Sequence, residues 1–189
     1  MIPEAEDFTL RNDAINKIYS ALEAVLQDTD FCVEKDYKFS QSYSVNPYTL
    51  KIDPKDTKEA FDVPLCIGKK APSGIVVPRV CIDIKYTLSS KKLSFLPCIA
   101  KAGNIKKANS FIRYGVFCLN ANTLDKNLLK ISLEQIDFVH ALGAFMEDKG
   151  KLESYLKDFA KEETYTSEFI LDIMHNDGVL QSIRRERYN

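Results

Sequence analysis

The chain has 189 residues, of which 45% are hydrophobic and 28% are charged, and its formal net charge is −1. This length suits one compact domain with a sizeable core, and no stretch approaches the roughly 20 apolar residues of a membrane span. A membrane protein is therefore not expected, and the net charge alone argues for neither a nucleic acid nor a membrane as partner.

The N-terminal residues and the cysteines predict where in the cell the protein is located. The N-terminal residues MIPEAEDFTL lack the positive start and apolar block of a secretory signal. The five cysteines are odd in number, widely spaced and set among apolar residues, so neither a disulfide framework nor a zinc knuckle is expected. These features predict a protein of the reducing cytoplasm.

The N-terminal half predicts one helix and three strands. Apolar residues recur at spacings of three and four from about Asn12 to Gln27, which indicates an amphipathic helix. Strands are predicted over Phe31 to Tyr43, Ala60 to Lys70 and Ile75 to Leu88, with a loop rich in Pro, Asn and Asp after the first strand. Pro64 inside the second strand indicates an edge strand or a bulge.

A different periodicity follows the third strand. A helix is predicted from about Leu96 to Asn109, and then a short apolar strand from Ile112 to Asn120, of the kind that is covered on both faces. Three neighbouring strands with short links suggest an antiparallel meander, whereas strand, helix and strand suggest a right-handed parallel crossover. The predicted fold is therefore α/β, with a mixed central sheet that combines an antiparallel meander with one parallel crossover strand and is flanked by helices.

The remaining residues are predicted to be helical. Ser132 and Gln135 form a capping-box pattern before an apolar run that contains His140. In this predicted helix His140 is expected to be a packed, hydrogen-bonded side chain and not a metal ligand. Two more helices are expected, from about Lys149 to Glu162 and from Ser167 to His175.

Two opposite charges, Asp83 and Lys85, interrupt the apolar third strand. Because side chains alternate along a strand, these two share one face with Cys81, while the aliphatic residues share the other face. An ion pair on a solvated face is the simplest interpretation. However, Asp62 is similarly embedded in the preceding strand, and in a hairpin the carboxylates of Asp62 and Asp83 could approach closely enough to hold a divalent cation.

This combination has the chemistry of phosphodiester hydrolysis. That reaction needs hard oxygen ligands for Mg²⁺, an activated water and positive charge against the transition state. Asp62 and Asp83 would be the metal ligands, with the backbone carbonyl of Ile84 as a third. Lys85 would position or deprotonate the attacking water. The segment from Lys85 to Arg113 also carries seven Lys or Arg and no acidic residue, which allows a local basic face.

The same residues carry a family resemblance. Asp62 together with DIK at 83–85 resembles the PD-(D/E)XK nuclease pattern, and the order of helix, three strands, helix and strand is similar to that superfamily's core. The stretches PRVCIDIKYTLSS and CIAKAGNIKKANSFIRYGVF, with IDF at 136–138, resemble small bacterial restriction-endonuclease-like proteins. The likeness covers roughly Ala60 to Phe138.

The resemblance implies a type II restriction enzyme that cleaves double-stranded DNA with Mg²⁺, for which Mn²⁺ would substitute. Residues 1–147 would form a restriction-endonuclease-like catalytic core, and residues 148–189 a helical C-terminal extension of the same domain. A homodimer is expected because cutting two antiparallel strands suits a two-fold assembly. Phosphate contacts of second rank are expected from Lys101, Lys106 and Arg113.

The chain also departs from the pattern. Phe61, and not a proline, precedes Asp62, whereas Asp53 does have a neighbouring proline. Glu23 is the candidate for the glutamate that many relatives place on the first helix. One alternative is a catalytically inactive nuclease-fold module that binds nucleic acid or a protein partner. A third interpretation is a helical interaction protein built on the C-terminal third.

Overall fold

The computed structural model describes residues 4–39, 43–45, 52–54, 61–72, 74–86, 96–120 and 135–187. In chain order the elements are α1 (Glu4–Leu26), β1 (Phe31–Phe39), β2 (Tyr43–Val45), β3 (Ile52–Pro54), β4 (Phe61–Lys70), β5 (Val76–Lys85), α2 (Leu96–Ala108), β6 (Arg113–Cys118), β7 (Phe138–Ala141) and α4 (Lys149–Arg187). Among these residues no helix has the length and apolar character needed to cross a membrane.

The five-stranded sheet is mixed, as the sequence predicts. Its strand order is β1-β4-β5-β6-β7. The pairs β1–β4 and β4–β5 are antiparallel and form the meander, whereas β5–β6 and β6–β7 are parallel. The crossover from β5 to β6 contains α2, and β7 adds a second parallel pair that the sequence does not predict. The strands β2 and β3 form a separate two-stranded sheet.

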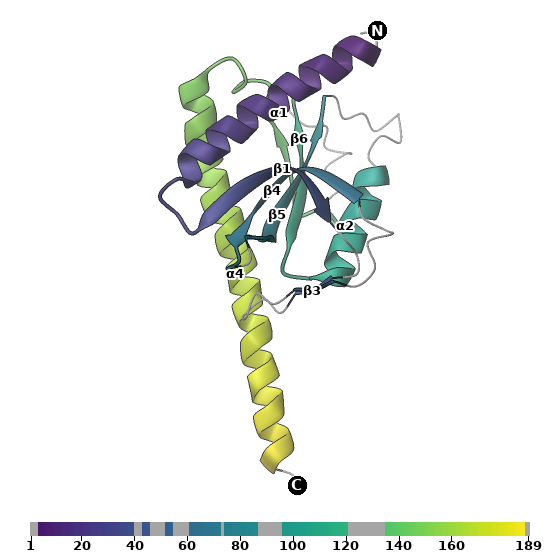
Figure 1. Ribbon diagram of the computed structural model, residues 1–189, viewed down its shortest axis with the longest axis vertical. Helices are drawn as coiled ribbons and strands as arrows, with labels where there is room; N and C mark the ends of the chain where they lie inside the picture. Colours follow the sequence, from purple (N-terminus) through teal and green to yellow (C-terminus); the bar gives the residue numbers. More distant parts are fainter. Residues whose placement is uncertain are drawn as a thin grey trace.

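Helices cover both faces of the large sheet (Figure 1). On one face, Val80, Ile82 and Ile84 of β5 pack in one cluster with buried residues of α1 and α4. On the other face, Cys81 packs in a second cluster with Cys98 and other residues of α2. The predicted alternation of β5 is therefore confirmed, and it directs Asp83 toward the face that α2 covers.

Three predicted helices differ from the structure. Residues Phe138–Ala141, expected within a helix, form β7, and His140 lies on this strand. A short apolar run has no period that separates a strand from a buried helix, so the sequence pattern is ambiguous there. The two expected C-terminal helices are one continuous helix, α4, of 39 residues.

Pro64 marks an irregularity and not a sheet edge, because β4 lies between β1 and β5. The Cα pairing of β1 with β4 runs from Lys35 opposite Leu65 to Tyr37 opposite Val63 and skips the pair between them. Proline has no N–H to donate to the ladder, and the opposing Asp36 has a φ of 50°. The β1–β4 ladder is therefore interrupted at this pair, which lies close to Asp62 in the sequence.

Candidate active site

The predicted residues come from the same end of two neighbouring antiparallel strands. Asp62 is the second residue of β4, and Asp83 is the third from the end of β5. The register places Leu65 opposite Ile82, so the start of β4 and the end of β5 lie side by side. Asp62 is nevertheless exposed, whereas Asp83 is 1% exposed. The two carboxylates therefore occupy different environments.

Asp83 is the centre of a buried polar cluster. Its Oδ1 accepts a hydrogen bond from the backbone N–H of Ile84 at 2.9 Å. Its Oδ2 accepts hydrogen bonds from Lys101 Nζ at 3.2 Å and from the Tyr114 hydroxyl at 3.3 Å. The Cys98 thiol lies 3.8 Å from the same oxygen. A buried carboxylate requires such partners, because an unpaired charge in the interior is costly.

Three cationic side chains surround this carboxylate. Lys101 makes the shortest ion pair, at 3.2 Å, and Lys85 Nζ and Arg11 Nη2 lie 3.7 Å and 3.9 Å from Oδ1. Lys85 and Lys101 are both about one quarter exposed, so each ammonium group can reach solvent while it pairs with Asp83. The predicted pair of Asp83 and Lys85 is thus one part of a larger charge cluster.

Lys101 links the two strands. Besides its contact with Asp83, its Nζ donates a hydrogen bond to the backbone carbonyl of Asp62 at 2.8 Å. The ammonium group of α2 therefore joins the backbone of β4 to the buried side chain of β5. The family resemblance implied only a secondary role for Lys101, as a phosphate contact, because spacing along the chain does not show which helix turn covers a strand end.

Burial keeps two neighbouring groups protonated. Burial first, and the negative charge of Asp83 second, raise the pKa of the Tyr114 hydroxyl far above its usual value. The same two causes raise the pKa of the Cys98 thiol to about 11. Both groups are therefore neutral hydrogen-bond donors near pH 7, which suits their positions beside the Asp83 carboxylate.

A hollow of about 400 Å³ adjoins this cluster. It is bounded by residues of α1, β1, β4 and α2, which are Arg11, Asn12, Ile15, Asp36, Asp62, Pro64 and Lys101. Pro64 and Asp36, the pair at which the β1–β4 ladder is interrupted, both contribute to its wall. Two basic and two acidic side chains thus meet at a surface hollow next to the buried Asp83.

At Asp83 and Ile84, the oxygens predicted to hold Mg²⁺ are already hydrogen-bonded within the protein. Both oxygens of Asp83 accept hydrogen bonds from the protein, and the carbonyl of Ile84, the expected third ligand, accepts one from Arg11 Nε at 3.1 Å. Among the described residues, no group of three or more His, Cys, Asp or Glu side chains could hold a metal ion. In this arrangement the residues do not present the open set of oxygens that a hard dication requires.

The other candidates lie elsewhere or outside the described residues. Glu23 accepts a hydrogen bond from Tyr19 at 3.2 Å on α1, and it is 12 residues from Arg11, about 18 Å along the helix. Arg11, which the sequence did not single out, is instead the α1 residue at the site. Asp53 lies on β3, and its side chain is outside the described part of the structure.

The basic run after Asp83 is partly neutralised by acidic partners. Lys106 and Arg113 both pair with Asp137 Oδ1, at 2.8 Å and 2.7 Å, and Arg113 also pairs with Glu163 of α4 at 2.8 Å. These ion pairs connect α2, β6 and α4. Lys106 and Arg113 are therefore structural links here, and Lys101 is the second-rank residue that lies at the candidate site.

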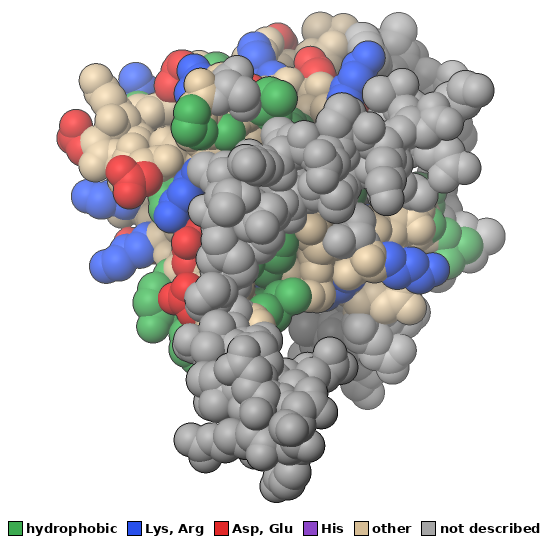
Figure 2. Space-filling model, turned by 60° about the horizontal axis from the view of Figure 1, so that its bottom comes forward, with side chains coloured by type: hydrophobic (Ala, Val, Ile, Leu, Met, Phe, Trp, Pro, Cys, Tyr) green, Lys and Arg blue, Asp and Glu red, His purple; other side chains and the backbone are tan. Residues whose placement is uncertain are grey.

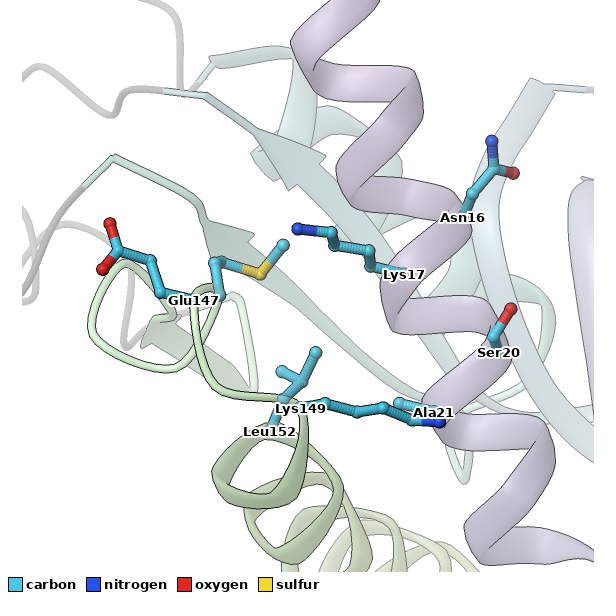
Figure 3. Close-up of a pocket in the computed structure, with 8 residues that line it drawn as sticks. Asn16, Lys17, Ser20, Ala21, Glu147, Lys149 and Leu152 are labelled. Atoms are coloured by element: carbon cyan, nitrogen blue, oxygen red, sulfur yellow. The ribbon is translucent and has the colours of Figure 1, made fainter.

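A separate hollow of about 380 Å³ lies between α1 and the first turn of α4 (Figure 3). Lys17 and Ser20 project from α1, and Lys149 extends from α4 toward Ala21 (Figure 3). The lining contains one carboxylate, that of Glu147, and shares no residue with the hollow beside Asp83. It therefore lacks the paired carboxylates that the predicted chemistry needs.

The comparisons with known proteins do not assign this site. No protein-family model matches the chain, and no curated protein matches it.

Proposed function

We propose that this chain is a Mg²⁺-dependent endonuclease that hydrolyses phosphodiester bonds of double-stranded DNA, in the manner of a type II restriction enzyme. The observation that supports this most directly is the position of Asp83. Its buried carboxylate lies at the end of β5, with Lys85 and Lys101 beside it and the backbone of Asp62 held by the same Lys101. One buried acid, two amines and the backbone of a second acid at the same end of β4 and β5 support the predicted catalytic set.

The cations suit a phosphodiester substrate. Hydrolysis adds negative charge to the phosphoryl oxygens in the transition state, and positive groups aimed at that charge lower the barrier. The ammonium groups of Lys85 and Lys101 are both partly exposed, and Lys101 lines the surface hollow. In the proposal they contact the phosphate, and Lys85 also positions the attacking water.

The proposed cofactor requires a local rearrangement. Asp83 and the carbonyl of Ile84 would hold Mg²⁺. Both already accept hydrogen bonds from Lys101 and Arg11, so these two side chains would have to give up those bonds first. The proposal therefore includes competition between a dication and two cationic side chains for one buried carboxylate. A cytoplasmic location belongs to the proposal, and the five free cysteines support it.

The test compares two lysines in similar surroundings. Plasmid and phage DNA are incubated with Mg²⁺ or Mn²⁺ and with the wild type, with Lys85→Ala or with Lys69→Ala. Lys69 is a good control because it is 30% exposed and pairs with Glu168, much as Lys85 is 27% exposed and pairs with Asp83. We expect discrete fragments from the wild type and Lys69→Ala, and a loss of at least about 100-fold in rate for Lys85→Ala.

Intact DNA with the wild type across many templates and both metals would contradict the nuclease proposal. Equal cleavage by Lys85→Ala and the wild type would remove Lys85 from the mechanism. Thermal melting of the two lysine variants separates loss of activity from loss of folding.

A second function is favoured by one specific observation. Asp83 is already neutralised by protein cations, as in a nuclease fold kept only to bind nucleic acid or a protein partner. Calorimetric titration with Mn²⁺ separates the two functions. Binding that is lost in Asp83→Asn favours the enzyme, whereas DNA binding without any Asp83-dependent metal binding favours the module.

A further inference from the structure

Arg11 carries hydrogen-bond donors that the protein does not use. Its Nε donates to the carbonyl of Ile84 at 3.1 Å, whereas its Nη2 lies 3.9 Å from Asp83 Oδ1, which is beyond hydrogen-bond distance. Among the described residues, the Arg11 side chain makes no other hydrogen bond or ion pair. The N–H groups of both Nη atoms therefore remain available to a ligand, on a side chain that is 35% exposed.

The two lysines of the cluster also keep unused donors. Lys85 Nζ lies 3.7 Å from Asp83 Oδ1 and forms no hydrogen bond with the described residues. Lys101 Nζ donates to Asp83 Oδ2 and to the carbonyl of Asp62, which leaves a further N–H group of this ammonium. Three cationic side chains thus share one buried carboxylate, so the immediate surroundings of Asp83 keep an excess of positive charge and of donors.

Arg11 and Lys101 face the same hollow from two sides. Arg11 belongs to α1 and Lys101 to α2, and both line the hollow of about 400 Å³. Because α1 and α2 pack on opposite faces of the sheet, an anion in this hollow would lie between the two cations at the strand ends. Asp36 and Asp62 also line the hollow and are exposed. Their charges oppose an anion, although exposure to water and salt weakens this effect.

Other basic side chains are less available. Lys106 and Arg113 are paired with acidic side chains. Figure 2 shows a face on which the coloured Lys and Arg side chains are interspersed with Asp and Glu, without a broad basic area, and the net charge of the chain is −1. Since phosphate contacts dominate the affinity of proteins for DNA, a local cluster with spare donors is the best source of such contacts here.

We propose that Arg11 binds a backbone phosphate of double-stranded DNA together with Lys101, and that this contact forms without a divalent metal ion. The assignment of Arg11 rests on the proposed function, because that function names DNA as the ligand. A guanidinium presents paired N–H donors that match two phosphate oxygens. Metal is not needed for this contact, because the positive charge around Asp83 is supplied by side chains.

The test measures DNA binding in the absence of metal. The full-length chain is titrated into a fluorescently labelled, mixed-sequence DNA duplex in EDTA at several salt concentrations, and anisotropy reports binding. The wild type should bind, and Arg11→Met should bind about 10-fold or more weakly, with a salt slope that is smaller by about one. Lys17→Met is the matched control and should bind as the wild type does, because Lys17 is an exposed cation of the same helix that lines a different hollow.

Two further variants separate the charge of Arg11 from a structural role. Arg11→Lys keeps the positive charge, so it should retain the salt slope of the wild type while losing part of the affinity, because lysine lacks the paired donors. Asp62→Asn removes a carboxylate from the hollow and should bind DNA more tightly in EDTA, by about 5-fold. Thermal melting shows whether each variant is folded.

Wild-type binding that is absent in EDTA, or equal binding by Arg11→Met and Lys17→Met, would overturn the assignment of Arg11. Weaker binding by Asp62→Asn would overturn it as well, since the phosphate would then lie outside the hollow. None of these results decides the nuclease proposal, because cleavage is measured separately with Mg²⁺. Binding in EDTA that depends on Arg11, combined with intact DNA in Mg²⁺ across many templates, would support the phosphate contact and contradict the nuclease.

Discussion

Arg11 Nε donates a hydrogen bond to the carbonyl of Ile84 at 3.1 Å, and Nη2 of the same guanidinium lies 3.9 Å from Asp83 Oδ1. A single side chain of α1 thus contacts two groups that the sequence predicts as metal ligands. The positive charge that accompanies Asp83 is supplied in this structure by the protein. If Mg²⁺ binds here, it competes with Arg11.

This competition gives the first prediction. Replacing Arg11 by Met removes the guanidinium and should tighten Mn²⁺ binding, on the order of 10-fold, because one positive charge near the carboxylate is lost. Calorimetric titration measures the affinity. Lys17→Met is the control, since Lys17 is an exposed cation of the same helix that lines a different hollow. Unchanged or weaker binding in Arg11→Met would mean that the ion does not use Asp83 and Ile84.

The second prediction concerns the charge of Asp83 itself. Asp83→Asn keeps the shape of the side chain but leaves three neighbouring cations without their buried counter-charge. The free energy of unfolding in urea should fall by about 1–3 kcal/mol. Asp62→Asn, at an exposed position, should change it by less than about 0.5 kcal/mol. Similar losses in both variants would show that the buried cluster does not stabilise the fold.

The third prediction is a pH effect at His140. This ring contacts the Tyr155 hydroxyl and packs against Phe159, and burial lowers the pKa of His140 below its ordinary 6.5. The folded state therefore binds this proton more weakly than the unfolded state does. Stability should be fully present above pH 6.5 and should decrease as the pH falls from there toward the folded-state pKa.

The variant His140→Phe tests this assignment. Urea denaturation is followed at several pH values from neutral to mildly acidic for the wild type and the variant. The wild type should lose more stability than His140→Phe over the window below pH 6.5. Parallel pH profiles would assign the acid sensitivity to other groups.

The fourth prediction compares two glycines. A Cβ added to Gly115 of β6 would lie 2.2 Å from Phe138 Cδ2 and 2.3 Å from the Phe138 carbonyl oxygen of β7. Gly115→Ala should therefore destabilise the protein by about 1–3 kcal/mol or more. Gly103 lies within α2, and its added Cβ would meet only Gln135 Oε1, at 4.0 Å.

Gly103→Ala is thus the opposite case. Alanine has the higher helix propensity, so this variant should be more stable than the wild type by about 0.5–1 kcal/mol. Thermal and urea denaturation measure both variants. A Gly115→Ala protein as stable as the wild type would show that β7 does not pack on β6 as closely as the structure has it.

Local patterns in the sequence were sufficient to predict most of the core. The periodicities of three and four in α1 and of two in β5 follow directly from helix and strand geometry, and both are confirmed. The antiparallel meander and the parallel crossover also follow from short links and chain chirality. The predicted pairing of β4 with β5 also places Asp62 and Asp83 at the same end of these two strands, in agreement with the register.

Tertiary packing decided what the sequence left open. The apolar run of β7 has no distinguishing period, so its strand depends on pairing with β6. Arg11 lies 72 residues from Asp83 in the sequence, and Lys101 lies 18 residues away, yet both reach its carboxylate. No local spacing encodes those contacts, because they depend on how α1 and α2 pack on the sheet. The sequence by itself determined which residues are charged inside the strands, and the fold determined which charges surround them.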